Sequence, residues 1–253
     1  MSYLNQQGWK VAYDVNFAAL STQNLRTGGN GTKTIDGKSW TWANDGNANT
    51  ATLTNGTGLV CNPLANVSSG NPITRTGPML HIPVDSLLAN GLNIVRHRIR
   101  VMIKVALTAA TLSAQGVRLG IEDAGAPTDQ AFNIFKGFNA GSNSFVYQSA
   151  KPTAAQSANV TDTSTFTDDV LVIDWDPPFG WGARTGAFGS DFPAAYSGFR
   201  FSEYMDTGNP SPTIRLRAEP RIALIWQDNN AGGGGFTGTI ARMRVLLQEK
   251  FPF

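Results

Sequence analysis

The stretch Ile94–Val105 (IVRHRIRVMIKV) alternates apolar and basic side chains, and it decides the fold class. Successive side chains of a strand point to opposite faces of its sheet, whereas a helix would scatter the arginines around its axis. One face holds Val95, His97, Ile99, Val101, Ile103 and Val105, and the other holds Arg96, Arg98, Arg100, Met102 and Lys104. The alternation predicts a half-buried β-strand with a basic outer face.

Short alternating or apolar segments recur along the rest of the chain, separated by turn-forming residues. Asp36-Gly37 predicts a hairpin, because this dipeptide adopts the positive φ angles of a two-residue turn. A second break is expected at Asn55-Gly56. Further strands are expected at 11–20, 38–43, 51–62, 117–122, 131–138, 144–149, 170–175, 213–218, 221–227 and 240–247, and one short helical turn at 84–90. This series predicts an all-β, antiparallel two-sheet sandwich with few or no helices.

Length and composition agree with one large β-domain. The chain has 253 residues, of which 41% are apolar and 15% are charged; the charged share is below the usual ~25%. We find no linker and no internal repeat. A single sandwich domain is therefore expected over 1–253, with long loops at about 62–83, 150–166 and 176–212.

Charge and cysteine content exclude few functions. The formal net charge of +2 is too weak to indicate nucleic-acid binding. The lone Cys61 excludes an intrachain disulfide and is expected to be a buried hydrophobe. No basic-then-apolar leader and no apolar run of membrane-spanning length are present, so we expect synthesis in a cytoplasm and no membrane partner.

Two segments carry a resemblance to a known family. They are AYDVNF at 12–17 with TKTIDGKSWTWAND at 32–45, and the closing run IALIWQDNNAGGGGFTGTIARMRVLL at 222–247. Together they resemble the concanavalin A-like (laminin-G-like) jelly-roll modules of bacteriophage virion proteins, over about 11–62 and 213–247. The resemblance implies a jelly roll and a place in a virion. The fold also hosts lectins, adhesion modules and glycoside hydrolases, so it does not choose a function alone.

The basic strand faces are candidate partner-binding surfaces. They comprise Arg96, Arg98, Arg100 and Lys104, then Arg215 with Arg217, and Arg242 with Arg244. If these strands are neighbours, like charges repel unless something acidic covers them. The cover would be a partner subunit, an anionic glycan or nucleic acid, and we favour protein. The alternative is that these side chains are solvated or paired with acids such as Asp168, Asp169 or Glu219.

Aromatic residues are dense between 175 and 201. They are Trp175, Phe179, Trp181, Phe188, Phe192, Tyr196, Phe199 and Phe201. Exposed rings stack on sugars or fill partner pockets, and buried rings pack inside a sandwich. Trp175, Phe179, Trp181 and Phe188 are the candidates for glycan or interface contacts.

Catalytic and metal signatures are weak. Asp174 and Asp176 share a strand face roughly 6–7 Å apart, near the spacing of glycosidase carboxylates. The concanavalin-like hydrolases, however, carry a Glu-x-Asp-x-x-Glu strand that this chain lacks. Asp45, Asn47 and Asn49 resemble the start of a calcium loop without its closing Glu. We therefore expect no catalytic residue, metal or cofactor.

These observations predict a non-enzymatic structural or binding protein of a bacteriophage virion: a capsid decoration or cement protein, or a tail or fibre protein. Its expected partners are other virion proteins and further copies of itself, with a trimer as the first expectation. The alternative is a carbohydrate-binding, lectin-like module, and a glycoside hydrolase ranks third.

Overall fold

The computed structural model describes most of the predicted strands. The described residues are 9–26, 30–43, 48–63, 78–88, 96–108, 115–123, 131–139, 142–149, 160–162, 169–176, 180–186, 197–201, 219–227 and 236–249. Within these ranges the helical elements are two short 3-10 turns, η2 (Phe17–Ala19) and η4 (Val84–Leu87). No helix in the described ranges is long and apolar enough to cross a membrane.

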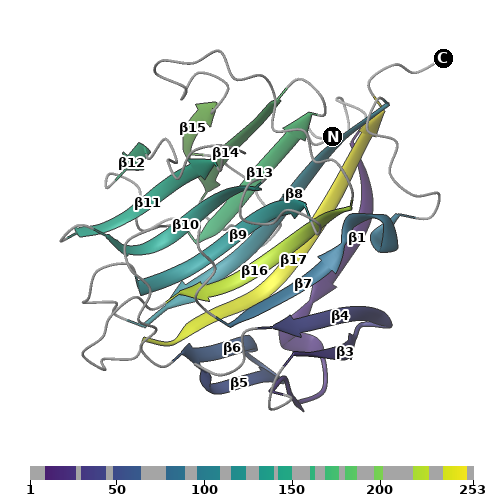
Figure 1. Ribbon diagram of the computed structural model, residues 1–253, viewed down its shortest axis with the longest axis vertical. Helices are drawn as coiled ribbons and strands as arrows, with labels where there is room; N and C mark the ends of the chain where they lie inside the picture. Colours follow the sequence, from purple (N-terminus) through teal and green to yellow (C-terminus); the bar gives the residue numbers. More distant parts are fainter. Residues whose placement is uncertain are drawn as a thin grey trace.

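The strands form two antiparallel sheets (Figure 1). The nine-stranded sheet runs β15 (Ser197–Phe201), β14 (Gly180–Gly186), β13 (Val170–Asp176), β8 (His97–Leu107), β17 (Gly238–Glu249), β6 (Gly58–Pro63), β5 (Ala48–Thr54) and β2 (Gln23–Asn24), with β1 (Lys10–Asn16) also paired to β17. The eight-stranded sheet runs β12 (Val160–Asp162), β11 (Ser142–Ser149), β10 (Ala131–Asn139), β9 (Gln115–Asp123), β16 (Pro220–Gln227), β7 (Met79–Pro83), β4 (Lys38–Ala43) and β3 (Gly31–Ile35). The predicted all-β two-sheet sandwich is confirmed.

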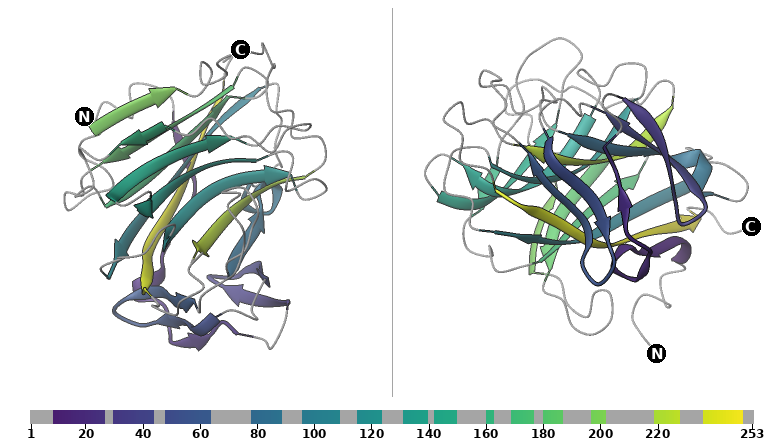
Figure 2. Two further views of the ribbon diagram at one scale, coloured as in Figure 1. Left: turned by 60° about the vertical axis from the view of Figure 1, so that its left-hand side comes forward. Right: turned by 90° about the horizontal axis from the view of Figure 1, so that it is seen from below.

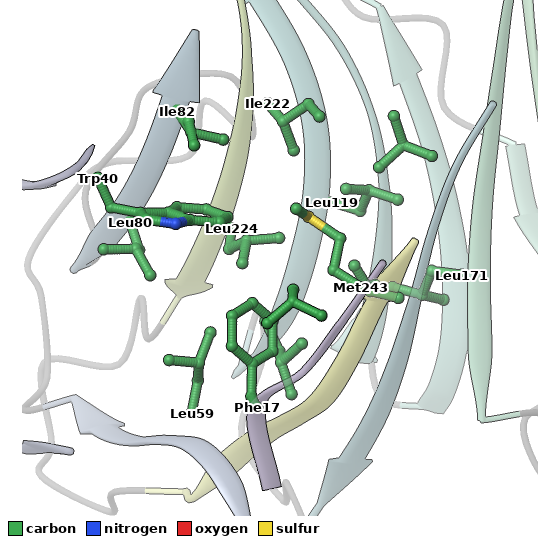
Figure 3. Close-up of a cluster of buried hydrophobic side chains, with 14 of the residues drawn as sticks. Phe17, Trp40, Leu59, Leu80, Ile82, Leu119, Leu171, Ile222, Leu224 and Met243 are labelled. Carbon is green, nitrogen blue, oxygen red and sulfur yellow. The ribbon is translucent and has the colours of Figure 1, made fainter. Parts of the chain in front are cut away.

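The hydrophobic core lies between the sheets. Figure 3 shows Leu80, Leu119, Ile222 and Leu224 of the eight-stranded sheet facing Leu59, Leu171 and Met243 of the nine-stranded one, with Phe17 of η2 between them. Trp40, Trp42 and Trp226 are fully buried in the same cluster, and so is Cys61, as predicted. The β3–β4 and β5–β6 hairpins gather at one end of the sandwich (Figures 1 and 2).

Both predicted tight turns are present. Asp36 and Gly37 have φ values of 50° and 69°, and they join β3 to β4. Positive φ at both central residues is the type I′ geometry that matches the right-handed twist of the strands. The turn at 55–57 divides β5 from β6, as expected at Asn55-Gly56. Turn chemistry therefore sets the register of both hairpins.

The structure corrects several sequence predictions. β1 ends at Asn16 and continues as a 3-10 turn, and its register shifts between Val11 and Tyr13. Val11 therefore does not share the buried face of Tyr13 and Val15, and it is exposed. The expected loops 62–83, 150–166 and 176–212 contain strands β7, β12, β14 and β15. Glycine-rich β14 is held as a strand by its pairing with β13, which overrides its weak intrinsic preference. The expected strand at 213–218 lies outside the described residues.

Candidate functional site

The basic side chains of β8 and β17 lie on the outer face of the nine-stranded sheet. The two strands pair antiparallel, with Lys104 opposite Arg242 and Met102 opposite Arg244. Residues directly opposite each other in a sheet point to the same side. The apolar residues that alternate with them, such as Val101 and Ile103, face the core. The two basic stripes are therefore neighbours on one face, which we call the polar face.

Aspartates on the flanking strands neutralise this polar face. On one side, Asp174 of β13 stands opposite Arg100, and its carboxylate accepts hydrogen bonds from Nε at 2.5 Å and Nη2 at 3.0 Å. Arg98 Nε lies 2.6 Å from Asp176 Oδ2. Lys104 Nζ lies 3.7 Å from Oδ2 of Asp169, one of the acids named in the alternative that the basic residues are paired within the chain. Arg98, Arg100 and Lys104 are therefore each paired with an aspartate of the same chain.

On the other side of the polar face, Asp14 of β1 holds two arginines. Arg242 donates to it from Nε at 2.8 Å and from Nη2 at 2.7 Å, and Arg244 donates at 2.9 and 2.5 Å. Burial alone raises the pKa of the Asp14 carboxyl. The hydrogen bonds and positive charges of Arg242 and Arg244 outweigh burial, so the net pKa lies below its ordinary 3.8. The carboxylate is the form that this geometry stabilises.

The middle of β8 is buried on both faces, which corrects the prediction of a half-buried strand. Met102 packs on the outer side with Val170, Val172 and Leu246, and Trp9 packs against this cluster. The guanidinium of Arg100 lies 4.5 Å from the centre of the Trp9 ring, within cation–π range. Only 6% of Arg100 is exposed. Arg100 is therefore a structural residue, contrary to its prediction as a partner-binding one.

The other predicted basic residues divide into three groups. Arg242 and Arg244 are partly buried and bound to Asp14. Arg96 is exposed, and the side chains of Arg98 and Lys104 are 48% and 39% exposed. Arg215 and Arg217 lie outside the described residues. Among the described basic candidates, the exposed ones are thus Arg98 and Lys104 of β8 and Arg96, which directly precedes β8.

The aromatic candidates are placed only in part. Trp175 is buried on the core side of β13, opposite Ile99, so its prediction as a glycan or interface residue was wrong. The alternation of β13 gives the reason: Asp174 and Asp176 point outward, which turns Trp175 inward. Trp181 of β14 pairs with Trp175 of β13, but the side chain of Trp181 lies outside the described part of the chain. Phe179 and Phe188 also lie outside the described residues.

Asp174 and Asp176 share the polar face, as their spacing predicted, but each is bound to an arginine. No group of three metal-ligating side chains occurs among the described residues. The side chains of Asp45, Asn47 and Asn49 are outside them.

A second polar group, which the sequence analysis missed, lies on the outer face of the eight-stranded sheet. Arg118 donates from Nε to Gln227 Oε1 through a short hydrogen bond, and from Nη1 to Asn133 Oδ1 at 3.1 Å. Its guanidinium lies 4.9 Å from the centre of the Phe135 ring. We call Arg118, Asn133 and Gln227 the arginine–amide cluster. Burial lowers the pKa of Arg118 to about 9.

The arginine–amide cluster had a faint sequence signal. Arg118 interrupts the apolar strand at 117–122, where Val117, Leu119 and Ile121 face the core. The alternation therefore places Arg118 on the outer face. Its amide partners come from β10 and β16, and only the strand order reveals that these strands flank β9. Glu122 is on the same face and lies 3.0 Å from Arg221 Nε.

Comparisons with known proteins identify the fold but show no family to which the chain belongs. No protein-family model matches the chain, and no curated protein matches its sequence. The lectin UEA-II complexed with galactose is 8% identical with a TM-score of 0.51, covering 94% of this chain and 100% of the lectin. Such identity shows a shared fold alone, and that fold is the jelly-roll sandwich of concanavalin A-like proteins.

Two further solved structures match over nearly the whole chain at lower similarity. The CBM2 module of the evolved Dit of Lactobacillus casei BL23 phage J-1 is 13% identical, with a TM-score of 0.44 and coverage of 98% of this chain and 99% of that one. The family GH16 endo-β-1,3(4)-glucanase SCLam is 10% identical, with a TM-score of 0.47 and coverage of 96% and 92%.

Proposed function

We propose that this protein is a non-enzymatic structural and binding component of a bacteriophage virion. The observation that carries the non-enzymatic part is the engagement of its paired carboxylates. Asp174 and Asp176 are held by Arg100 and Arg98 at 2.5 and 2.6 Å. Glycosidases need two carboxyl groups that can reach the glycosidic bond, one as general acid and the other as base or nucleophile. Two arginine-bound carboxylates on a closely paired strand support binding over catalysis.

The resemblance of the opening and closing segments to virion modules supports the place in a virion. The segments that carry it are joined in space, because β1 and β6 both pair with β17. In the other sheet, β4 of the opening segment and β16 of the closing segment both pair with β7. The two segments therefore lie close together in both sheets of the sandwich. In this proposal the chain is made in the host cytoplasm and then decorates or cements the capsid, or joins a tail or fibre.

The proposed partners are other virion proteins and further copies of the chain, with a trimer as the first expectation. The exposed residues Arg96, Arg98 and Lys104 are the proposed contact region. A rim of exposed charge mainly sets the specificity and rate of association. With a net charge of +2 there is little to attract nucleic acid, and neither nucleic acid nor a membrane is a proposed partner.

Carbohydrate binding is the second candidate function. The observation that favours it is the full-length match to the lectin complexed with galactose, at a TM-score of 0.51. Carbohydrate binding and the virion role are both binding functions without catalysis. They differ in the partner, which is a glycan for the lectin-like module and another virion protein for the virion component.

Light scattering of the purified protein, together with a glycan array and a polysaccharide turnover assay, separates these functions. The first candidate predicts a symmetric oligomer, with three times the chain mass of 27.0 kDa for a trimer, and no sugar release. A monomer that retains specific glycans would favour the second candidate. Turnover of a polysaccharide that the D174N variant loses would overturn both in favour of a hydrolase.

A further inference from the structure

The arginine–amide cluster is buried on a sheet face where the core does not account for it. Arg118, Gln227 and Asn133 are only 4%, 3% and 7% exposed. Gln227 pairs with Gly116 and Asn133 with Gly120, so the two amides approach Arg118 from the strands on either side. This arrangement places one guanidinium between two amide side chains on three adjacent strands.

The hydrogen bonds fix how the two amides are turned. Arginine can only donate, so the amide atoms that face it are oxygens. The NH₂ groups of Gln227 and Asn133 therefore take no part in these two hydrogen bonds. The Gln227 Nε2 is buried and has no hydrogen-bond partner. A buried donor without an acceptor is costly, and each such group in a native protein calls for an explanation.

The floor of the cluster is rigid. Gly116 and Gly137 are paired across β9 and β10, and the Phe135 ring lies against both. A Cβ on Gly116 would meet Phe135 Cε2 at 2.6 Å, and one on Gly137 would meet Cζ at 2.5 Å. The absence of side chains at these two glycines lets the ring lie where the Arg118 guanidinium stacks on it. The donors are thereby held in place before any ligand arrives.

We propose that the arginine–amide cluster binds one small oxyanion, whose oxygens accept hydrogen bonds from Gln227 Nε2 and from the Arg118 guanidinium. An oxyanion offers acceptors only and carries the negative charge that a buried guanidinium attracts. Glu122, on the same face of β9, is engaged by Arg221. The depth of burial favours a small ion over a polymer. Carboxylate, sulfate and phosphate share this chemistry, and the proposal does not depend on which partner the protein binds.

Calorimetric titration of the full chain tests the site, with acetate, sulfate and phosphate as probes at an ionic strength held constant with sodium chloride. We expect one ion per chain, and the probe with the highest affinity distinguishes a planar carboxylate from a tetrahedral anion. The Gln227→Glu variant keeps the side-chain size and places a carboxylate on the donors, so binding should weaken at least tenfold. Gln248→Glu, on the outer face of the other sheet, adds the same charge and should bind like wild type.

Two results would overturn the proposal. One is the absence of binding heat for all three probes in the wild-type chain, which would leave water as the partner of Gln227 Nε2. The other is equal affinity in the Gln227→Glu and Gln248→Glu variants. If Gln227→Glu does not fold, Arg118→Lys replaces it: this variant keeps the positive charge but loses the guanidinium fork. It should also bind at least tenfold more weakly, and unchanged affinity would contradict the site.

Discussion

Arg100 of β8 and Asp174 of β13 stand directly opposite each other, and the aspartate accepts two hydrogen bonds from the guanidinium, at 2.5 and 3.0 Å. In the sequence, Arg100 belongs to a basic stripe that is a candidate for partner binding. Asp174 belongs to a carboxylate pair spaced like those of glycosidases. Paired in this way, Arg100 and Asp174 stabilise the sheet. The bidentate geometry is the strong form of such a contact, and the arginine is almost entirely buried.

Removal of the Asp174 charge should therefore cost stability. In Asp174→Asn the Arg100 guanidinium stays buried without its carboxylate, and we expect a loss of about 1–3 kcal/mol in the free energy of unfolding. Asp176→Asn is the matched control, because its partner Arg98 is 48% exposed. Solvent screens that pair, so the loss should stay below about 1 kcal/mol. Urea unfolding measures both, and equal losses would contradict the structural role of Arg100.

Acid should weaken the polar face through Asp14. Its folded-state pKa lies below 3.8, the ordinary value expected in the unfolded chain. Its stabilisation is therefore complete above about pH 4 and is lost as the pH falls through the folded-state pKa. Asp14→Asn should cost about 1 kcal/mol at neutral pH, because the pairs are partly exposed. Unfolding measured between pH 7 and pH 2 should show a shallower acid-side decline in this variant than in wild type, and parallel curves would count against the proposed pairing.

The β5–β6 hairpin should distinguish two glycines that both have positive φ. Gly56 has φ +81° with open space around its Cα, so Gly56→Ala should cost about 1–2 kcal/mol from backbone strain alone. Gly58 has φ +117°, and a Cβ there would collide with the Ile240 carbonyl oxygen and meet Ala241 Cα at 2.8 Å. Strain and overpacking together should cost about 3–4 kcal/mol in Gly58→Ala. Similar thermal midpoints for the two variants would contradict the close approach of β6 to β17.

Trp175 should behave as a core residue. Trp175→Ala removes a large side chain from between the sheets and should cost about 3–5 kcal/mol. Val11→Ala, at an exposed position, should change stability by less than about 0.5 kcal/mol. Denaturant unfolding of the two variants makes the comparison. A fully stable Trp175→Ala protein that had lost glycan binding would restore Trp175 as a surface residue.

The fold class follows from local patterns that survive in the structure. Period-two alternation in 97–105 and 240–247 predicts strands because one face of each meets the core. Asp36-Gly37 predicts a hairpin because few other dipeptides adopt two positive φ angles in succession. Glycine-rich β14 has no such signal, since its strand conformation comes from pairing with β13.

The sites are harder to predict because they depend on strand order. β1 and β13 flank the basic strands from positions far away in the sequence, and that placement alone brings Asp14 and Asp174 to their arginines. The arginine–amide cluster likewise draws on three strands. Sequence alternation can say that Arg118 faces outward, but it cannot say that Gln227 and Asn133 come to meet it.

The most direct test of the central claim is mass spectrometry and cryo-electron microscopy of purified virions of the bacteriophage to which the proposal assigns this chain. The proposal predicts the chain at a fixed copy number per particle. It also predicts density for the sandwich as a symmetric oligomer seated on the capsid or the tail, with Arg96, Arg98 and Lys104 near the contact. A chain that is made in infected cells but is absent from the purified particles would contradict the proposal.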